Sequence, residues 1–199
     1  MIRHIVFDIG WVFVNLDPQP LLDFLAVRGA GALELAEVIA RIGLEDHERG
    51  RLAGPALLAN IAGLVNQSVD HADVHAAWLD MFELQPSMVA LARRLSDRYR
   101  VHLLSNVGDL HWAHLCERYD VHRIGHGALP SFIAGVTKPD AGIYAEAERR
   151  FALEPAATVF IDDRADNIEA ARARGWHGIV HRSYQATRDA LVELGVAAD

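Results

Sequence analysis

The sequence predicts an α/β fold in which a doubly wound, mainly parallel sheet forms the core and carries an inserted helical cap. Two observations lead to this prediction. Short apolar runs that stop at polar residues alternate with helical patterns, and the alternation breaks between about residues 18 and 85. Ligands of such sheets bind beyond the carboxyl ends of the strands. The polar residues at the strand ends should therefore lie along one edge of the sheet.

Four apolar runs are candidate strands because each is short and ends abruptly at polar residues, as buried parallel strands do. They are residues 5–7 before Asp8, 101–104 before Ser105 and Asn106, 158–161 before Asp162 and Asp163, and 178–180 before His181. Helical spacing of apolar residues lies between them, at Met88, Leu91, Ala92 and Leu95 and again at Ile143, Tyr144 and Ala147. The order of strands and helices is that of a sheet covered on both faces.

The interrupting segment predicts helices over 21–28, 32–42, 55–65 and 71–82 and no strand. Prolines at 18, 20 and 86 mark its two junctions. We therefore expect the core to comprise 1–16 and 86–199 and the cap to comprise 17–85.

Composition narrows the possible functions. The 199 residues are 51% hydrophobic, and 19 basic against 27 acidic side chains give a net charge of −8. This charge disfavours nucleic acid and anionic membranes as partners. The single cysteine, the short first apolar run and the absence of a 20-residue apolar stretch predict a cytoplasmic protein without a disulfide, signal peptide or membrane span. We expect a monomer or a homodimer.

The strand ends carry the candidate chemistry. Asp8, Asp162 and Asp163 offer the hard oxygen ligands that suit Mg²⁺, which proteins hold with one or two carboxylates, waters and a phosphate. The Ser105 hydroxyl and Lys138, after a long loop, could bind the remaining phosphate oxygens.

Four motifs in this order resemble the haloacid dehalogenase-like (HAD) hydrolase superfamily. They are Phe7-Asp8-Ile9-Gly10, Leu104-Ser105-Asn106, Lys138-Pro139-Asp140, and Phe160-Ile161-Asp162-Asp163-Arg164-Ala165-Asp166-Asn167. The resemblance covers nearly the whole chain and implies a Rossmann-like core. With His47-Glu48-Arg49-Gly50, the chain is most similar to the branch with a small helical cap, which includes bacterial sugar-phosphate phosphatases such as glucose-1-phosphate phosphatase.

This resemblance implies a Mg²⁺-dependent phosphatase that acts on a small phosphorylated metabolite, expected to be a sugar phosphate. Asp8 would be the nucleophile and a metal ligand, together with the Gly10 carbonyl and Asp163, while Asp162 and Asn167 would steady the metal. Ser105, Asn106 and Lys138 would bind the phosphoryl group, and Arg49 of the cap would contact the substrate.

Gly10 departs from the superfamily pattern, in which phosphatases usually have a general acid/base Asp two residues after the nucleophile. Such a group contributes about 10²–10⁴-fold to the rate. Its absence predicts a strong dependence on the leaving group, unless another residue such as Asp17 or His111 supplies the proton.

Other interpretations of these residues stay open at this point. Asp8 could be a turn residue, Asp162-Asp163 a helix cap, Ser105 the cap of a helix near Asp109, and Lys138 a solvated cation. For the whole chain, the alternatives are a 2-haloacid dehalogenase, which usually lacks the acidic pair that Asp162 and Asp163 form in the fourth motif, and a phosphometabolite-binding protein that has lost turnover.

Overall fold

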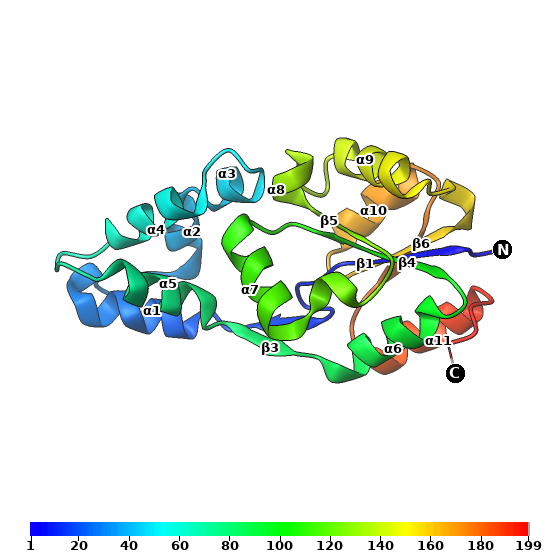
Figure 1. Ribbon diagram of the computed structural model, residues 1–199, viewed down its shortest axis with the longest axis horizontal. Helices are drawn as coiled ribbons and strands as arrows, with labels where there is room; N and C mark the ends of the chain where they lie inside the picture. Colours follow the sequence, from blue (N-terminus) through cyan, green and yellow to red (C-terminus); the bar gives the residue numbers. More distant parts are fainter. Residues whose placement is uncertain (199) are drawn as a thin grey trace.

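The computed structural model describes residues 1–198 and contains a five-stranded, wholly parallel sheet (Figure 1). Its strands are β1 (His4–Phe7), β4 (Arg100–Ser105), β5 (Ala128–Pro130), β6 (Thr158–Asp162) and β7 (His177–Val180), in the spatial order β5-β4-β1-β6-β7. The chain starts in the middle of the sheet and extends it on both sides, which is the doubly wound arrangement. The predicted fold class is confirmed.

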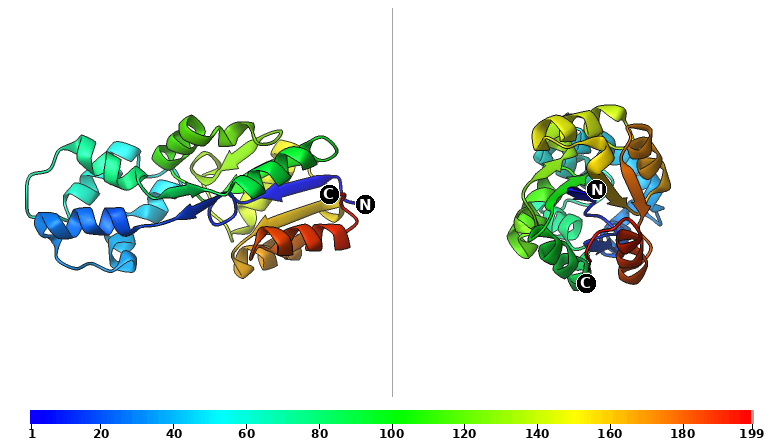
Figure 2. Two further views of the ribbon diagram at one scale, coloured as in Figure 1. Left: turned by 90° about the horizontal axis from the view of Figure 1, so that it is seen from below. Right: turned by 90° about the vertical axis from the view of Figure 1, so that its right-hand side faces the viewer.

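Helices cover both faces of this sheet (Figure 2). Helices α9 (Ala141–Phe151) and α10 (Ala165–Ala173) pack on the face that carries Val6 and Phe160. Helices α6 (Pro86–Ser96), α7 (Asp109–Tyr119) and α11 (Tyr184–Glu193) cover the face of Phe7 and Ile161. Successive residues of a strand point to opposite faces, so these strands are apolar throughout, as the sequence predicted.

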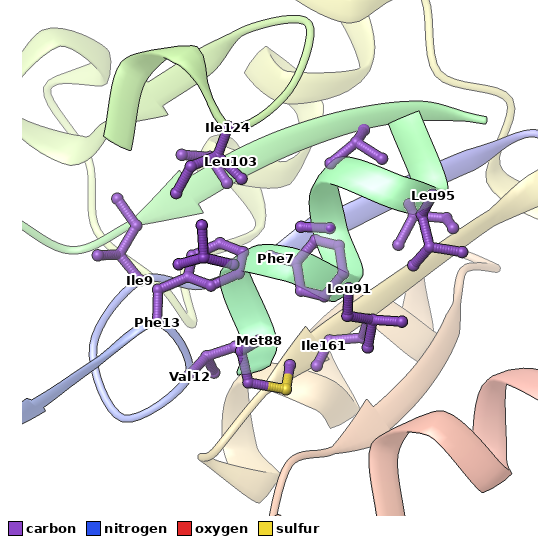
Figure 3. Close-up of a cluster of buried hydrophobic side chains, with 14 of the residues drawn as sticks. Phe7, Ile9, Val12, Phe13, Met88, Leu91, Leu95, Leu103, Ile124 and Ile161 are labelled. Carbon is purple, nitrogen blue, oxygen red and sulfur yellow. The ribbon is translucent and has the colours of Figure 1, made fainter. Parts of the chain in front are cut away.

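The second of these faces holds the larger hydrophobic cluster, part of which is drawn in Figure 3. Phe7 and Phe13 lie with ring centroids 5.2 Å apart, and Met88 and Leu91 of α6 pack beside them. Phe13 lies in the loop that follows Asp8, so this packing also fixes the backbone around the strand end.

The cap helices form a separate lobe beyond one end of the sheet, on the left in Figure 1. They are α1 (Gln19–Leu25), which continues as a π-helical turn (Ala26–Ala30), α2 (Leu35–Ile42), α3 (Leu44–Glu48), α4 (Gly54–Ala62) and α5 (His71–Leu79). Their apolar sides enclose a cluster of their own, which includes Leu21, Ile42, Leu57, Val74 and Trp78.

A two-stranded antiparallel ribbon, β2 (Val14–Leu16) with β3 (Phe82–Leu84), joins the cap to the core. The prediction that the cap segment holds no strand was therefore wrong at its end, and the last predicted helix stops at Leu79 rather than residue 82. A three-residue strand has too little alternation to be recognised in sequence, and here pairing with β2 determines it.

Four other short elements were not predicted. They are the edge strand β5, which ends at a proline, the 3₁₀ turns Val121–Arg123 and Pro155–Ala157, and helix α8 (Ser131–Ala134). Helix α2 starts at Leu35, three residues later than predicted. Lys138, which we grouped with the strand ends, lies instead in the loop between α8 and α9. Within residues 1–198, no helix is both long and apolar enough to span a bilayer.

Candidate active site

Three adjacent strands in the middle of the sheet bring the predicted site residues together. Asp8 follows β1, Ser105 ends β4 and Asp162 ends β6, and β1 pairs with both of the others. Because the strands are parallel, these ends lie side by side, and we call this edge the rim. The edge predicted from the sequence therefore exists in the fold.

Lys138 lies between two rim carboxylates. Its Nζ is 2.9 Å from Asp8 Oδ2 and 2.6 Å from Asp162 Oδ2, and its side chain is 1% exposed. A cation buried this deeply requires anionic partners because its desolvation is costly. Lys138 is therefore not a solvated loop cation, and it holds two carboxylates close together that would otherwise repel each other.

Burial changes the ionisation of this group. It raises the pKa of Asp8 to about 6, although Lys138 opposes the rise and Asp162 adds to it. Burial alone would lower the pKa of Lys138. The negative charges of Asp8 and Asp162 have the larger effect, so the pKa of Lys138 is raised. Lys138 therefore stays charged and favours the ionised form of Asp8.

Asp162 and Asp163 occupy different environments. Both oxygens of the fully buried Asp162 accept from Asn167 Nδ2 at 3.0 Å, and Oδ1 also accepts from the Arg164 amide at 2.8 Å. Asp163 is partly exposed and faces the rim hollow. Asp162 thus fixes the backbone just before α10 and orients Lys138, but it is not the N-cap residue, which is Arg164. The side chain of Asp163 is available for a ligand.

The carboxylates of Asp8, Asp162 and Asp163 could hold a cation, because one oxygen of each lies within 4.8 Å of the others. Asn167 Oδ1 is a further buried acceptor that has no partner among the described residues. An all-oxygen donor set suits Mg²⁺. The residues present therefore fit the predicted metal.

Asn106 fixes the loop that carries Lys138. Its Oδ1 accepts from the Lys138 amide at 2.8 Å, and its Nδ2 donates to the Lys138 carbonyl at 2.9 Å. Asn106 therefore positions Lys138 from the end of β4, and the second proton on its Nδ2 is not used by these two bonds. Ser105 is buried and hydrogen-bonds Asp8, which lowers the pKa of that carboxyl.

The cap closes over the rim at α3. The buried Ser131 hydroxyl donates to the Glu48 carbonyl at 2.6 Å, and Arg49 Nη2 lies 2.8 Å from Glu45 Oε1. Glu48 and Arg49 thereby face a polar hollow of about 760 Å³ above the rim. All predicted site residues line this hollow except Asp162, which lies behind it.

Sequence reasoning did not assign a role to Glu48. Burial raises its pKa to about 7, Lys138 opposes the rise, and Asp8 adds to it. Glu48 belongs to the His47-Glu48-Arg49-Gly50 motif, but only the docking of α3 on the core brings it to the rim, so the sequence did not show its role. A signal did exist for Lys138, since it is the one lysine in the sequence among 19 basic residues.

Several open interpretations are settled by position. Gly108, not Ser105, precedes α7 as its N-cap residue. His111, a candidate proton source, has its Nε2 3.0 Å from the Trp78 carbonyl, and its ring stacks on Trp78. Trp11 is 51% exposed beside the rim, so it does not pack in the core.

The fold and the site define an α/β enzyme whose ionised groups gather at the carboxyl edge of its sheet. The chain belongs to the haloacid dehalogenase-like hydrolase family, whose sequence profile matches residues 14–175. It is thus a hydrolase of the family that the motifs indicated.

Individual proteins agree with this assignment. D-ribitol-5-phosphate phosphatase of Bacteroides thetaiotaomicron is 25% identical over 190 residues, which are 88% of this chain and 90% of that protein. A HAD family enzyme of the same organism, solved with magnesium and inorganic phosphate, superposes with a TM-score of 0.81 at 23% identity over 92% of this chain and 95% of that one. L-2-haloacid dehalogenase of Xanthobacter autotrophicus superposes with a TM-score of 0.62 at 18% identity, over 99% of this chain and 85% of that one.

Proposed function

We propose that this protein is a Mg²⁺-dependent phosphatase that hydrolyses a small phosphorylated metabolite through an aspartyl-phosphate on Asp8. The observation that carries the proposal is the pairing of Lys138 with Asp8 and Asp162 beside the three-carboxylate cluster. This arrangement supplies a nucleophile, a fixed cation and ligands for a second cation around one point, as phosphoryl transfer requires.

Asp8 is held in one orientation for attack. Its Oδ1 accepts from the Ile9 amide at 2.7 Å, and its Oδ2 faces Lys138. Asp8, the Gly10 carbonyl and Asp163 would hold Mg²⁺, with Asp162 and Asn167 beside or behind it. When bound, Mg²⁺ would offset the charge of the phosphoryl oxygens. Ser105, Asn106 and Lys138 would keep the phosphoryl group in line with Asp8.

We assign substrate selection to the cap, residues 17–85, and chemistry to the core, residues 1–16 and 86–199. Arg49 reaches the polar hollow from α3 and would contact the substrate. We expect Arg49→Ala to raise KM for the preferred substrate about tenfold or more while kcat on a small aryl phosphate changes little. Steady-state kinetics on both substrates test this. Equal losses on both would place Arg49 among the catalytic or structural groups.

The nature of the substrate's alcohol is a further part of the proposal. The sequence predicts a sugar phosphate and one relative is named for D-ribitol-5-phosphate, whereas the side chains that line the space beside the rim are mainly apolar. All of these substrates share a phosphate group, and the rim geometry supports the binding of that group.

One comparison of activities tests the proposed function against its alternatives. We expect phosphate release from 4-nitrophenyl phosphate with Mg²⁺, loss of that activity in EDTA, and no chloride release from 2-chloropropionate. Chloride release would favour the dehalogenase. Tight Mg²⁺-dependent binding of phosphate esters without hydrolysis across a broad panel would favour the non-catalytic binding protein.

A further inference from the structure

A cavity of about 210 Å³ lies beside the polar hollow, between the cap and the core. Its wall is mostly aliphatic and aromatic. The cap contributes Leu21, Leu35, Val38, Ile39, Ile42, Leu44, Trp78 and Met81, and the core contributes Ile9, Val14 and Leu115. We call this space the apolar cavity.

The mouth of the apolar cavity exposes large hydrophobic side chains to solvent. Trp11, Leu35 and Ile39 line it and are 51%, 37% and 38% exposed. Trp11 also has a φ of 56°, a strained conformation for a bulky residue. Exposed apolar side chains gathered around an opening are typical of a site that binds an apolar ligand.

The interior of the apolar cavity offers few hydrogen-bonding partners. Burial lowers the pKa of His111 to about 4, so its ring is neutral, and its Nε2 already pairs with the Trp78 carbonyl. The buried Trp78 Nε1 is a single donor without a partner among the described residues. A polyol carries a hydroxyl on nearly every carbon, and most would be buried here without partners, which is unfavourable.

The apolar cavity and the polar hollow meet at the rim. Six residues line both of them, namely Gly10, Trp11, Leu16, Glu48, Ser105 and Asn106. A phosphate ester whose phosphoryl group faces Asp8 therefore has its organic group directed across this junction. The apolar cavity is the space that the junction opens into.

We propose that the substrate is the phosphate monoester of a mainly apolar alcohol, whose hydrocarbon group occupies the apolar cavity. This inference rests on the proposed phosphatase function and makes the alcohol specific. A dry protein cavity of about 150 Å³ binds benzene, so 210 Å³ has room for a hydrocarbon group of at least that size. One acceptor on this group could pair with Trp78 Nε1.

The test compares primary alkyl phosphates whose leaving groups have similar basicity but different polarity. With Mg²⁺ present, we expect kcat/KM for n-hexyl phosphate to exceed that for D-ribitol 5-phosphate and glycerol 3-phosphate at least tenfold. Equal or better turnover of either polyol phosphate would overturn the proposal. Acetyl phosphate, an acyl phosphate with almost no organic group, separates the two claims. If neither the three esters nor acetyl phosphate is hydrolysed, the phosphatase function itself fails.

A variant pair locates the effect at the apolar cavity. Ile39→Asn places an amide at its mouth on an already exposed position, so the fold should tolerate it. We expect kcat/KM for n-hexyl phosphate to fall at least fivefold while that for acetyl phosphate changes less than twofold. Val27→Asn, on a cap side chain that is 77% exposed and outside the apolar cavity, is the matched control. Equal effects of the two variants on n-hexyl phosphate would contradict the assignment.

The junction also suggests what replaces the missing acid at Gly10. Among the six shared residues, Glu48 is the one with a carboxylic acid side chain, and it reaches the junction from α3. The scissile bond joins a phosphoryl group on one side of this junction to an alcohol on the other. The bond from Ser131 to the Glu48 carbonyl fixes this end of α3 on the core.

We further propose that Glu48 is the general acid and base of the reaction. As an Asp8 oxygen bonds to phosphorus, the ester P–O bond breaks and its electron pair stays on the alcohol oxygen, which takes the Glu48 proton. The Glu48 carboxylate then takes a proton from the water that attacks phosphorus. Phosphate leaves with the oxygen of that water, and Asp8 is regenerated.

Leaving-group dependence separates this role from a structural one. In single turnovers, Glu48→Gln should slow alcohol release from n-hexyl phosphate about 10²–10⁴-fold but slow 4-nitrophenol release less than tenfold, because nitrophenolate leaves without a proton. Equal losses on both esters, or none, would overturn the proposal. Glu37→Gln, on the exposed side of α2, is the control.

Rescue from position 10 gives a second readout. A Cβ at Gly10 would lie 3.5 Å from Leu16 Cδ1, an ordinary contact, so the backbone there accepts a side chain. When Gly10→Asp is added to Glu48→Gln, the rate on n-hexyl phosphate should rise at least tenfold above that of Glu48→Gln alone. The rate on 4-nitrophenyl phosphate should change little. A double variant as slow as Glu48→Gln on n-hexyl phosphate would contradict an acid role at this junction.

Discussion

At the scale of single residues, neighbouring carboxylates of the same sequence pair have different tasks. Asp162 has every oxygen occupied by Lys138, Asn167 or the Arg164 amide, whereas Asp163 faces the hollow. The doublet in the sequence does not show this division. It follows from the alternation of strand residues at the end of β6, which turns one carboxylate inward and the next toward the rim.

This difference predicts opposite effects of two substitutions. Asp163→Ala should weaken Mg²⁺ binding more than tenfold and change the free energy of unfolding little. Asp162→Ala should lower the free energy of unfolding by about 3–5 kcal/mol, because it removes a partner of the buried Lys138. Mg²⁺ titration and urea unfolding of both variants measure this. If Asp162→Ala folds stably and loses more Mg²⁺ affinity than Asp163→Ala does, Asp162 rather than Asp163 is the main metal ligand.

At the scale of elements, the contact between α3 and the core determines where the cap residues face the rim. Gly50 follows α3 with a φ of +69°, and a Cβ there would lie 2.3 Å from the Phe132 carbonyl oxygen. This close approach leaves no space for any other residue. The position of Glu48 and Arg49 over the hollow therefore depends on a glycine that does not line the hollow itself.

Gly50→Ala should consequently impair catalysis as well as stability. We expect kcat/KM on alkyl phosphates to fall at least tenfold, because α3 must move away from α8. Gly195→Ala is the matched control, since Gly195 has a φ of +78° and nothing within 4 Å of a Cβ. That control should cost about 1–2 kcal/mol of stability through backbone strain alone and leave activity unchanged. Similar activity of both variants would show that the α3 contact does not position the cap residues.

The same scale shows what the sequence can and cannot predict. The strands that end at Asp8, Ser105 and Asp162 were predictable because buried parallel strands are apolar over their whole length and stop at polar residues. The ribbon β2–β3 and strand β5 were not, because three residues carry no periodicity. The position of Glu48 at the rim and the apolar cavity were not predictable either, since both depend on the packing of helices that are distant in sequence.

At the scale of the whole molecule, buried histidines make stability depend on pH. Burial lowers the pKa of His102 to about 4, and neither ring nitrogen has a partner among the described residues. The unfolded chain binds this proton near pH 6.5 while the folded chain does not. The resulting stabilisation is present above pH 6.5 and is lost as the pH falls toward 4. Asp8 and Glu48, whose pKa values are raised, act in the opposite direction.

His102→Phe isolates the contribution of one histidine. Its ring stacks on Phe151 in the core at 4.2 Å, so phenylalanine should fit. The variant's free energy of unfolding minus that of the unaltered protein should rise by about 2–3 kcal/mol as the pH falls from 6.5 to 4. Urea unfolding across this range measures the difference. A difference that stays constant with pH would mean that His102 titrates normally in the fold.

The most direct test of the account is to identify the covalent intermediate. The protein is mixed with a ³²P-labelled phosphate ester and Mg²⁺, quenched in acid within one turnover, and digested for peptide analysis. We predict labelled phosphate on the peptide that contains Asp8, and none in Asp8→Asn or in EDTA. Label on another residue, or unimpaired turnover by Asp8→Asn, would contradict a phosphatase that works through Asp8.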